Sequence, residues 1–104
     1  MKCYAGTREA HAVVVTVDDR PLNPRFDLWN HSPTGFEWGY GGSGPAQLAL
    51  ALLADCIGND EQATELHQEF KRKVVANLEG RGWTMTSHEI HAWVKTLTKS
   101  ERRP

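Results

Sequence analysis

The sequence predicts an α+β fold, in which a small antiparallel sheet from the N-terminal half packs against three C-terminal helices. Two observations carry this prediction. Before Tyr40 the chain is rich in β-branched and aromatic residues, interrupted by prolines and paired aspartates. After Gly44 apolar residues recur at helical spacing, with capping residues near the expected helix ends.

The length and charge of the chain are those of one ordinary domain. It has 104 residues, a net charge of −1, 39% hydrophobic residues and 24% charged residues. We expect a single domain over residues 1–98 and a basic, flexible tail over residues 99–104. Because the charges nearly balance, direct binding to nucleic acid is not expected.

The cellular compartment is predicted from two signals that the sequence lacks, a membrane-spanning segment and a signal peptide. No apolar run approaches the roughly 20 residues that cross a bilayer, and the first residues do not form a signal peptide. A cytoplasmic location without membrane contact is therefore expected. In that compartment Cys3 and Cys56 should be free thiols.

Three strands are predicted in the first part of the chain. Residues 1–7 form a short candidate, and residues 11–17 (HAVVVTV) the strongest one. Turn residues follow, and residues 23–34 are expected to be a loop because prolines and asparagines interrupt them. Residues 36–40 alternate aromatic residues with Glu37 and Gly39, which is typical of a half-buried strand.

The first predicted helix covers residues 45–57. Ser43 or Gly44 would cap it, and Gly58 suits the position after its last turn. Its apolar residues occupy nearly every face, so we expect burial on all sides.

Two more helices are predicted after Gly58. One covers residues 60–78, with Asn59 as its cap. The other begins with the capping box formed by Thr86 and Glu89, and its apolar stripe consists of Ile90, Trp93, Val94 and Leu97.

The glycine-rich segment before the first helix is a candidate anion site. Backbone N–H groups at a helix N-terminus attract phosphate, and Gly41, Gly42, Ser43 and Gly44 would supply them, with the Gln47 amide nearby. The segment lacks the lysine of a nucleotide-binding P-loop. A tight turn that lets the helix pack closely is the competing interpretation.

No catalytic or metal-binding set is recognisable. His88 and His91 are three residues apart, whereas a zinc-protease helix needs a spacing of four. The chain contains no C-x-x-C pair, and Ser43 lacks the last glycine of a nucleophile elbow. We therefore expect a protein that is not an enzyme and holds no metal or cofactor.

Acidic and aromatic residues indicate a surface for a protein partner. Glu61, Glu65 and Glu69 are spaced by four and lie on one helix face, with Asp55 shortly before them. A solvated face would explain this stripe equally well. Trp29 lies among polar residues in the proline-containing loop, and exposed tryptophans commonly anchor interfaces.

The block FEWGYGGSGPAQLALALL, the segment FKRKVVANL and the tryptophan-containing end resemble a family of small uncharacterised prokaryotic domains. The resemblance extends from Tyr4 to Val94. Members occur in bacterial genomes and on phages, plasmids and other mobile elements, which implies a role in conflict between element and host. No family activity, substrate or catalytic residue can be carried over.

The favoured hypothesis is a non-enzymatic protein-interaction module. A mobile-element origin would fit an anti-CRISPR-like inhibitor that occupies a site on a host defence or nucleic-acid-handling complex. The alternative is a small phosphate- or nucleotide-binding domain that uses the segment from Gly41 to Gly44.

Overall fold

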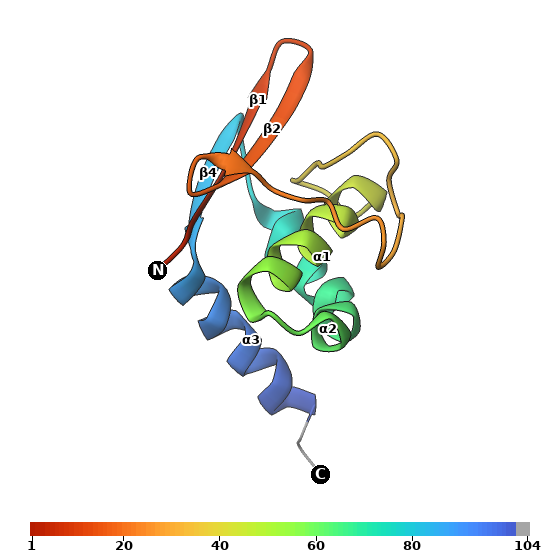
Figure 1. Cartoon of the computed structure of the whole chain (residues 1–104), viewed down its shortest axis with the longest axis vertical. Helices are drawn as coiled ribbons and strands as arrows, with labels where there is room; N and C mark the ends of the chain where they lie inside the picture. Colours follow the sequence, from red (N-terminus) through yellow and green to blue (C-terminus); the bar gives the residue numbers. More distant parts are fainter. Residues whose placement is uncertain (102–104) are drawn as a thin grey trace.

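The computed structural model describes the backbone of residues 1–101 and the side chains of residues 1–98. Within them, four strands form one antiparallel sheet and three α-helices complete an α+β domain, which confirms the predicted class (Figure 1). The elements are β1 (Cys3–Glu9), β2 (Ala12–Val17), β3 (Arg20–Pro21), α1 (Ser43–Ile57), α2 (Asp60–Lys73), the short 3-10 helix η1 (Val75–Asn77), β4 (Gly82–Thr86) and α3 (Ser87–Glu101).

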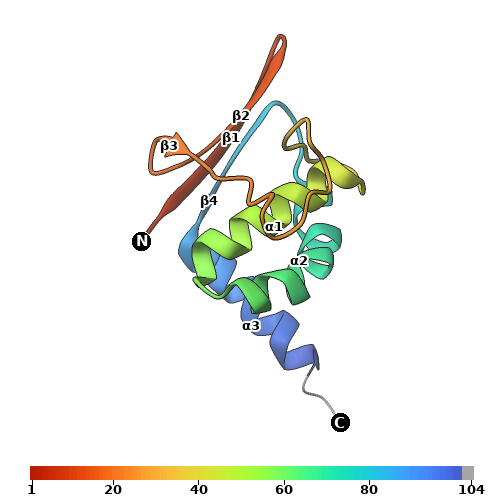
Figure 2. The same cartoon turned by 45° about the vertical axis from the view of Figure 1, so that its right-hand side comes forward.

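The sheet has the strand order β3-β2-β1-β4. β1 and β2 form a hairpin whose tip projects beyond the helices (Figure 1). β4 returns from the far end of the chain to pair with the other edge of β1, with Gly6 opposite Trp83. All three helices lie on one side of the sheet (Figure 2).

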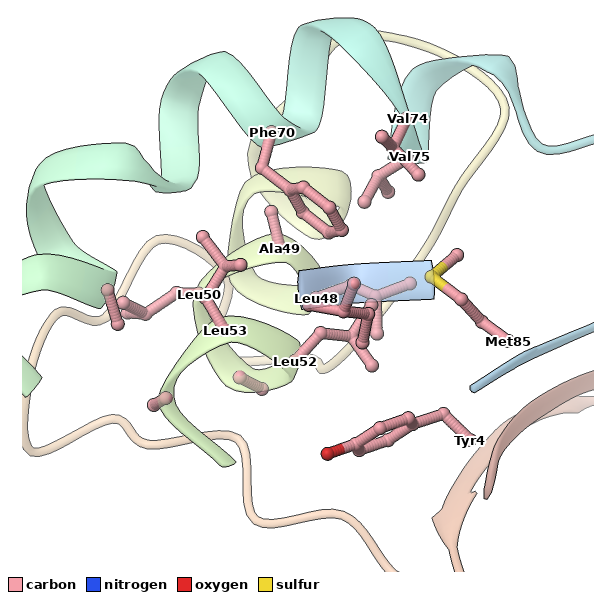
Figure 3. Close-up of a cluster of buried hydrophobic side chains, with 14 of the residues drawn as sticks. Tyr4, Leu48, Ala49, Leu50, Leu52, Leu53, Phe70, Val74, Val75 and Met85 are labelled. Carbon is pink, nitrogen blue, oxygen red and sulfur yellow. The ribbon is translucent and has the colours of Figure 1, made fainter. Parts of the chain in front are cut away.

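Helix α1 is the centre of the core. Its residues 44–54 are buried, because the sheet covers one side and α2 covers another. Figure 3 shows Tyr4 and Met85 reaching from the sheet toward Leu52, while Phe70 approaches α1 from α2. The predicted burial of this helix on all sides is confirmed, and it explains why the segment has no polar face.

The predicted strand over residues 36–40 is wrong. This segment forms no strand, since Gly39 has a φ of +90° and donates its N–H to the carbonyl of Val75. Both edges of β1 are already paired, one with β2 and the other with β4. β4, a segment in which the sequence analysis predicts no strand, occupies the second edge of β1.

Several helix ends differ from the prediction. α1 begins at Ser43 with Gly42 as its cap, so neither Ser43 nor Gly44 caps it. α2 ends at Lys73, where the chain continues into η1. The predicted Asn59 cap is confirmed by its hydrogen bond from the Gln62 N–H (3.0 Å).

At the start of α3, Thr86 and Glu89 form the predicted capping box, because each side chain accepts the other residue's backbone N–H. Trp93 lies at the margin of the apolar stripe and is 39% exposed instead of buried. The helix backbone continues to Glu101. The side chains of the predicted basic tail, residues 99–104, lie outside the described residues.

Candidate functional site

A single buried side chain, Gln47, fastens the loop that precedes α1. Its Oε1 accepts hydrogen bonds from the backbone N–H groups of His31 (2.7 Å) and Ser32 (3.1 Å). Its Nε2 donates to the carbonyl oxygens of Pro24 (2.7 Å) and Trp29 (2.9 Å). The amide therefore uses its full hydrogen-bonding capacity on the loop. It points at this loop and not at a ligand beside the glycine segment.

Trp29 stands on the surface of the loop that Gln47 holds, with 51% of its area exposed. Its ring stacks on the imidazole of His31, with centroids 4.8 Å apart and planes inclined by 11°. The ring of His67, from α2, lies 5.9 Å away. Both the backbone and the ring of Trp29 are thus fixed, and its exposed area has one orientation.

The two histidines below Trp29 bind each other. Their Nε2 atoms are 2.9 Å apart, and the Nδ1 of His67 lies 2.6 Å from the carbonyl oxygen of Thr64. A carbonyl only accepts, so His67 is protonated on Nδ1 and its Nε2 accepts the N–H of His31. Burial lowers the pKa of both rings, and the nearby Lys71 ammonium lowers it further.

An ion-pair cluster also joins this loop to α2. The Arg25 guanidinium, whose residue has a φ of +59°, contacts Asp60 (2.8 Å) and Asp27 (3.0 Å). The hydrogen bond from Arg25 lowers the pKa of the Asp27 carboxyl. The loop therefore contacts α2 both through the ion pair to Asp60 and through the histidine pair.

The predicted acidic stripe is divided by its ion pairs. Glu61 and Glu65 are exposed and form no ion pair with any residue whose side chain is described. Glu69 instead pairs with Arg72 and with Lys73 (3.7 Å), and the Arg72 contact lowers the pKa of its carboxyl. The net negative charge of the stripe therefore lies at the N-terminal end of α2. At this end Arg25 pairs with Asp60 and so binds the Trp29 loop, residues 23–34, to the helix.

Asp55 has a different setting from the carboxylates of α2. Its Oδ2 accepts a hydrogen bond from the Tyr4 hydroxyl (2.7 Å) and pairs with Lys2 (3.1 Å). Burial, followed by the Asp55 carboxylate, raises the pKa of Tyr4. Asp55 thus joins α1 to β1, and the structure does not bring it together with Trp29.

The glycine segment shows close packing. A Cβ on Gly44 would lie 2.8 Å from the Cβ of Glu37, and one on Gly42 would lie 2.7 Å from the Tyr40 ring. The first turn of α1 leaves few donors, because Pro45 has no N–H and Ala46 already donates to Gly42. Tight packing against Glu37 therefore accounts for Gly44, whereas Gly42 meets only the exposed ring of Tyr40, which can turn away.

A groove of about 780 Å³ nevertheless lies beside this helix end, between the β1–β2 hairpin and residues 32–37. Its walls mix charges of both signs. Glu37 accepts from Arg8 Nη2 at 2.7 Å, and the Arg8 guanidinium also lies 4.4 Å from the centre of the Trp38 ring. Ser43, Gly44 and Arg81 also line the groove.

Over the described part of the chain, no three His, Cys, Asp or Glu side chains are grouped so that they could hold a metal ion. His88 and His91 are both exposed on α3. Cys3 and Cys56 are free thiols, and burial raises the pKa of Cys56. None of the helices in this part is long and apolar enough to cross a membrane.

Sequence reasoning missed the polar contacts that hold the Trp29 loop. The sequence analysis places Gln47 at the anion site, and it does not pair His31 with His67. A signal was present for Gln47 alone, as a polar residue inside an otherwise apolar helix. Nothing in the spacing of the two histidines predicts that they meet.

Comparison with known proteins places the chain in one family. No curated protein and no solved structure matches it significantly. Residues 4–96 match the model of a family described as a family of unknown function (DUF6166). Since the match covers nearly the whole domain, the chain belongs to this family.

Proposed function

We propose that this protein is a non-enzymatic protein-interaction module whose contact surface is centred on Trp29. The observation that carries the proposal is an exposed tryptophan held rigidly: the side chain is 51% exposed, yet His31 stacks on it and Gln47 binds its carbonyl. Tryptophan is among the residues that contribute most to interfaces. An anchor fixed before binding loses little conformational entropy on association.

The surroundings of Trp29 indicate the chemistry of the partner. Phe26, on the same loop, is 40% exposed and adds apolar area. Glu61 and Glu65 lie on the exposed side of α2, to which the loop is bound. A partner that contacts both the Trp29 loop and this acidic face of α2 would need an apolar pocket and a basic rim.

Proteins that handle nucleic acid have such basic surfaces. The resemblance to domains of phages and other mobile elements supports the finer proposal of a cytoplasmic inhibitor. It would block a host defence complex in the manner of anti-CRISPR proteins, through protein contacts instead of direct binding to nucleic acid.

The test compares two tryptophan variants. Immobilised wild-type protein should capture a defined complex from host lysate, and the complex should then be purified and titrated. Trp29→Ala should weaken binding at least about tenfold, the loss of roughly 1.4 kcal/mol that a modest hot spot contributes. Trp93→Ala, which removes another exposed tryptophan on α3, is the matched control and should bind normally. Equal binding by both variants would contradict the proposal.

The charge contribution needs a separate variant. Glu61→Lys combined with Glu65→Lys should slow association and reduce its dependence on salt, because exposed charges act mainly through steering. Arg72→Glu with Lys73→Glu makes a charge change of the same size, with opposite sign, at the other end of α2. If the first pair has no effect on the association rate, the acidic part of the surface takes no part in binding.

The groove beside α1 favours one alternative, a phosphate- or nucleotide-binding domain. Arg81, Ser43 and Gly44 line it at the positive end of the helix. Inorganic phosphate and ADP are the probes, and a ligand at a hundred times its dissociation constant should stabilise the fold by about 2.7 kcal/mol. Arg81→Gln should abolish the shift, and Arg72→Gln, outside the groove, should preserve it. No shift with either probe would remove this alternative.

A further inference from the structure

The two edges of the sheet differ in how they are protected. The edge formed by β3 is only two residues long, Arg20–Pro21, and Pro21 has no N–H to offer. The opposite edge is β4, which has five residues, Gly82–Thr86, without a charge or a proline. Within the described residues β4 pairs only with β1. The β3 edge thus has a charge and a proline, features that usually prevent association, whereas β4 has neither. β3 pairs with Thr16 and Val17 of β2, and the rest of β2 belongs to the projecting hairpin (Figure 1).

Two hydrogen bonds fix which backbone groups of β4 face β1. Just before β4, Arg8 donates its N–H to the Arg81 carbonyl (2.6 Å), and just after it, Ser87 donates to the Lys2 carbonyl (2.9 Å). In an antiparallel ladder alternate residues face the same neighbour. The odd-numbered residues from 81 to 87 therefore bond to β1, and the even-numbered residues direct their N–H and C=O groups outward.

The outward groups of β4 are largely without partners. The Thr86 N–H donates to the Glu89 carboxylate of the capping box (2.8 Å). The N–H and C=O groups of Gly82 and Thr84 form no hydrogen bond with any residue of the described chain on this side. Thr84 lies at the centre of this open edge, and its side chain is exposed.

We propose that β4 pairs with β4 of a second copy of this chain, antiparallel and with Thr84 on the two-fold axis. Each Thr84 would donate its N–H to the carbonyl of the other Thr84. Each Gly82 would donate to the Thr86 carbonyl of the other copy. The two sheets then continue as one sheet, with the order β3-β2-β1-β4-β4-β1-β2-β3.

The arrangement of donors favours a second copy over a foreign strand. The Thr86 N–H already donates to the Glu89 carboxylate. In the two-fold pairing Thr86 lies at the end of the paired segment, and there only its carbonyl accepts a hydrogen bond from the other copy. Since β4 has no charge, pairing it with itself brings no like charges together. Threonines directly opposite each other in antiparallel strands also stabilise the pairing.

The experiment measures the mass of the whole protein in solution by light scattering. It compares the wild type with variants that carry a charged side chain at position 84. Thr84→Lys and Thr84→Glu each place like charges across the two-fold axis, so each variant alone should show half the mass of the wild-type dimer. An equimolar mixture should recover the dimer, since opposite charges then meet. Thr7→Lys is the matched control, because Thr7 is exposed on β1, a central strand, and should leave the dimer intact.

Circular dichroism of each variant verifies that the fold is retained. A monomeric wild-type protein at high concentration would overturn the proposal, as would a dimer that persists in both single variants or a mixture that stays monomeric. The proposal is independent of the Trp29 surface. Trp29→Ala should leave the mass unchanged, so the two proposals can fail separately.

Discussion

His31 and His67 meet through their Nε2 atoms, 2.9 Å apart, and this contact joins the Trp29 loop to α2. The hydrogen bond needs an N–H on one ring and an unprotonated Nε2 on the other, so it is lost once both rings are protonated. The position of the exposed tryptophan therefore depends on a protonation state, and the first prediction follows from it.

Stability should decrease as the pH falls below about 6.5. Both rings have folded-state pKa values below the ordinary 6.5, so the unfolded chain takes up protons first. The stabilisation is complete above the unfolded pKa and is lost as the pH falls toward the folded pKa. Urea unfolding at about pH 7.5 and about pH 5.5 should show a loss on the order of 1 kcal/mol, the value of one hydrogen bond.

The control for this pH effect replaces two histidines that lie outside the His31–His67 pair. Replacing both exposed histidines of α3, His88→Gln and His91→Gln, should leave the pH dependence unchanged. His67→Phe should lower stability at neutral pH and flatten the pH profile. A profile that keeps its full slope in His67→Phe would show that other groups cause it.

Gln47→Leu should release the Trp29 loop before it unfolds the domain. The substitution leaves the N–H groups of His31 and Ser32 without their acceptor, and each unsatisfied buried group costs about 1–3 kcal/mol unless it reaches water. The loop can regain water by moving away from α1. We expect a lower melting temperature, red-shifted tryptophan emission and faster proteolysis within residues 23–34.

Gln62→Leu is the matched control, because it removes a glutamine from the first turn of α2 whose side chain takes part in none of these loop contacts. It should change neither proteolysis nor emission. Equal protection of the loop in both variants would mean that Gln47 is not its anchor.

The sequence predicted well the features that local physics determines. The all-apolar surface of α1 predicts burial on every side, and the caps at Asn59 and Thr86 follow from residue type and spacing alone. These signals act within a few residues of each other. They do not depend on which distant segment lies next to them.

The choice between residues 36–40 and β4 could not be made in this way. Both segments alternate large apolar residues with small or polar ones, so both resemble a half-buried strand. The outcome depends on which of them reaches the open edge of β1, a contact between opposite ends of the chain. The positive φ of Gly39 and the pairing of both edges of β1 with β2 and β4 leave the first segment outside the sheet.

The candidate site was predictable only in part. The exposure of Trp29 agrees with its polar neighbours in the sequence. Its fixed orientation depends on Gln47 and His67, which are distant in sequence. The acidic stripe was predicted from its spacing, but the ion pairs of Glu69 could be known only from the structure.

Arg8→Lys should destabilise the domain although it preserves the charge. Arg8 donates two hydrogen bonds to Glu37, binds the carbonyls of Gly80 and Trp38 and stacks over the Trp38 ring. A lysine ammonium cannot reproduce this planar fork. We expect a loss of about 1–3 kcal/mol in urea unfolding, whereas Arg72→Lys, on the exposed side of α2, should cost less than about 0.5 kcal/mol.

The contact between Gly6 and Trp83 gives the last prediction. A Cβ on Gly6 would lie 2.5 Å from the Trp83 ring, which packs on Gly6 because the two residues are opposite each other in β1 and β4. Gly6→Ala should therefore cost about 1–3 kcal/mol, as overpacking does. In a Trp83→Ala background the ring is gone, and the same substitution should cost much less.

A double-mutant cycle measured by urea unfolding should give a coupling energy between about 0.5 and 3 kcal/mol. Additive effects would mean that Trp83 does not lie over Gly6 and that the register of β4 is different. β4 is also the strand proposed to pair with a second copy. The cycle therefore tests the register between β1 and β4, which decides which residues of β4 face outward for that pairing.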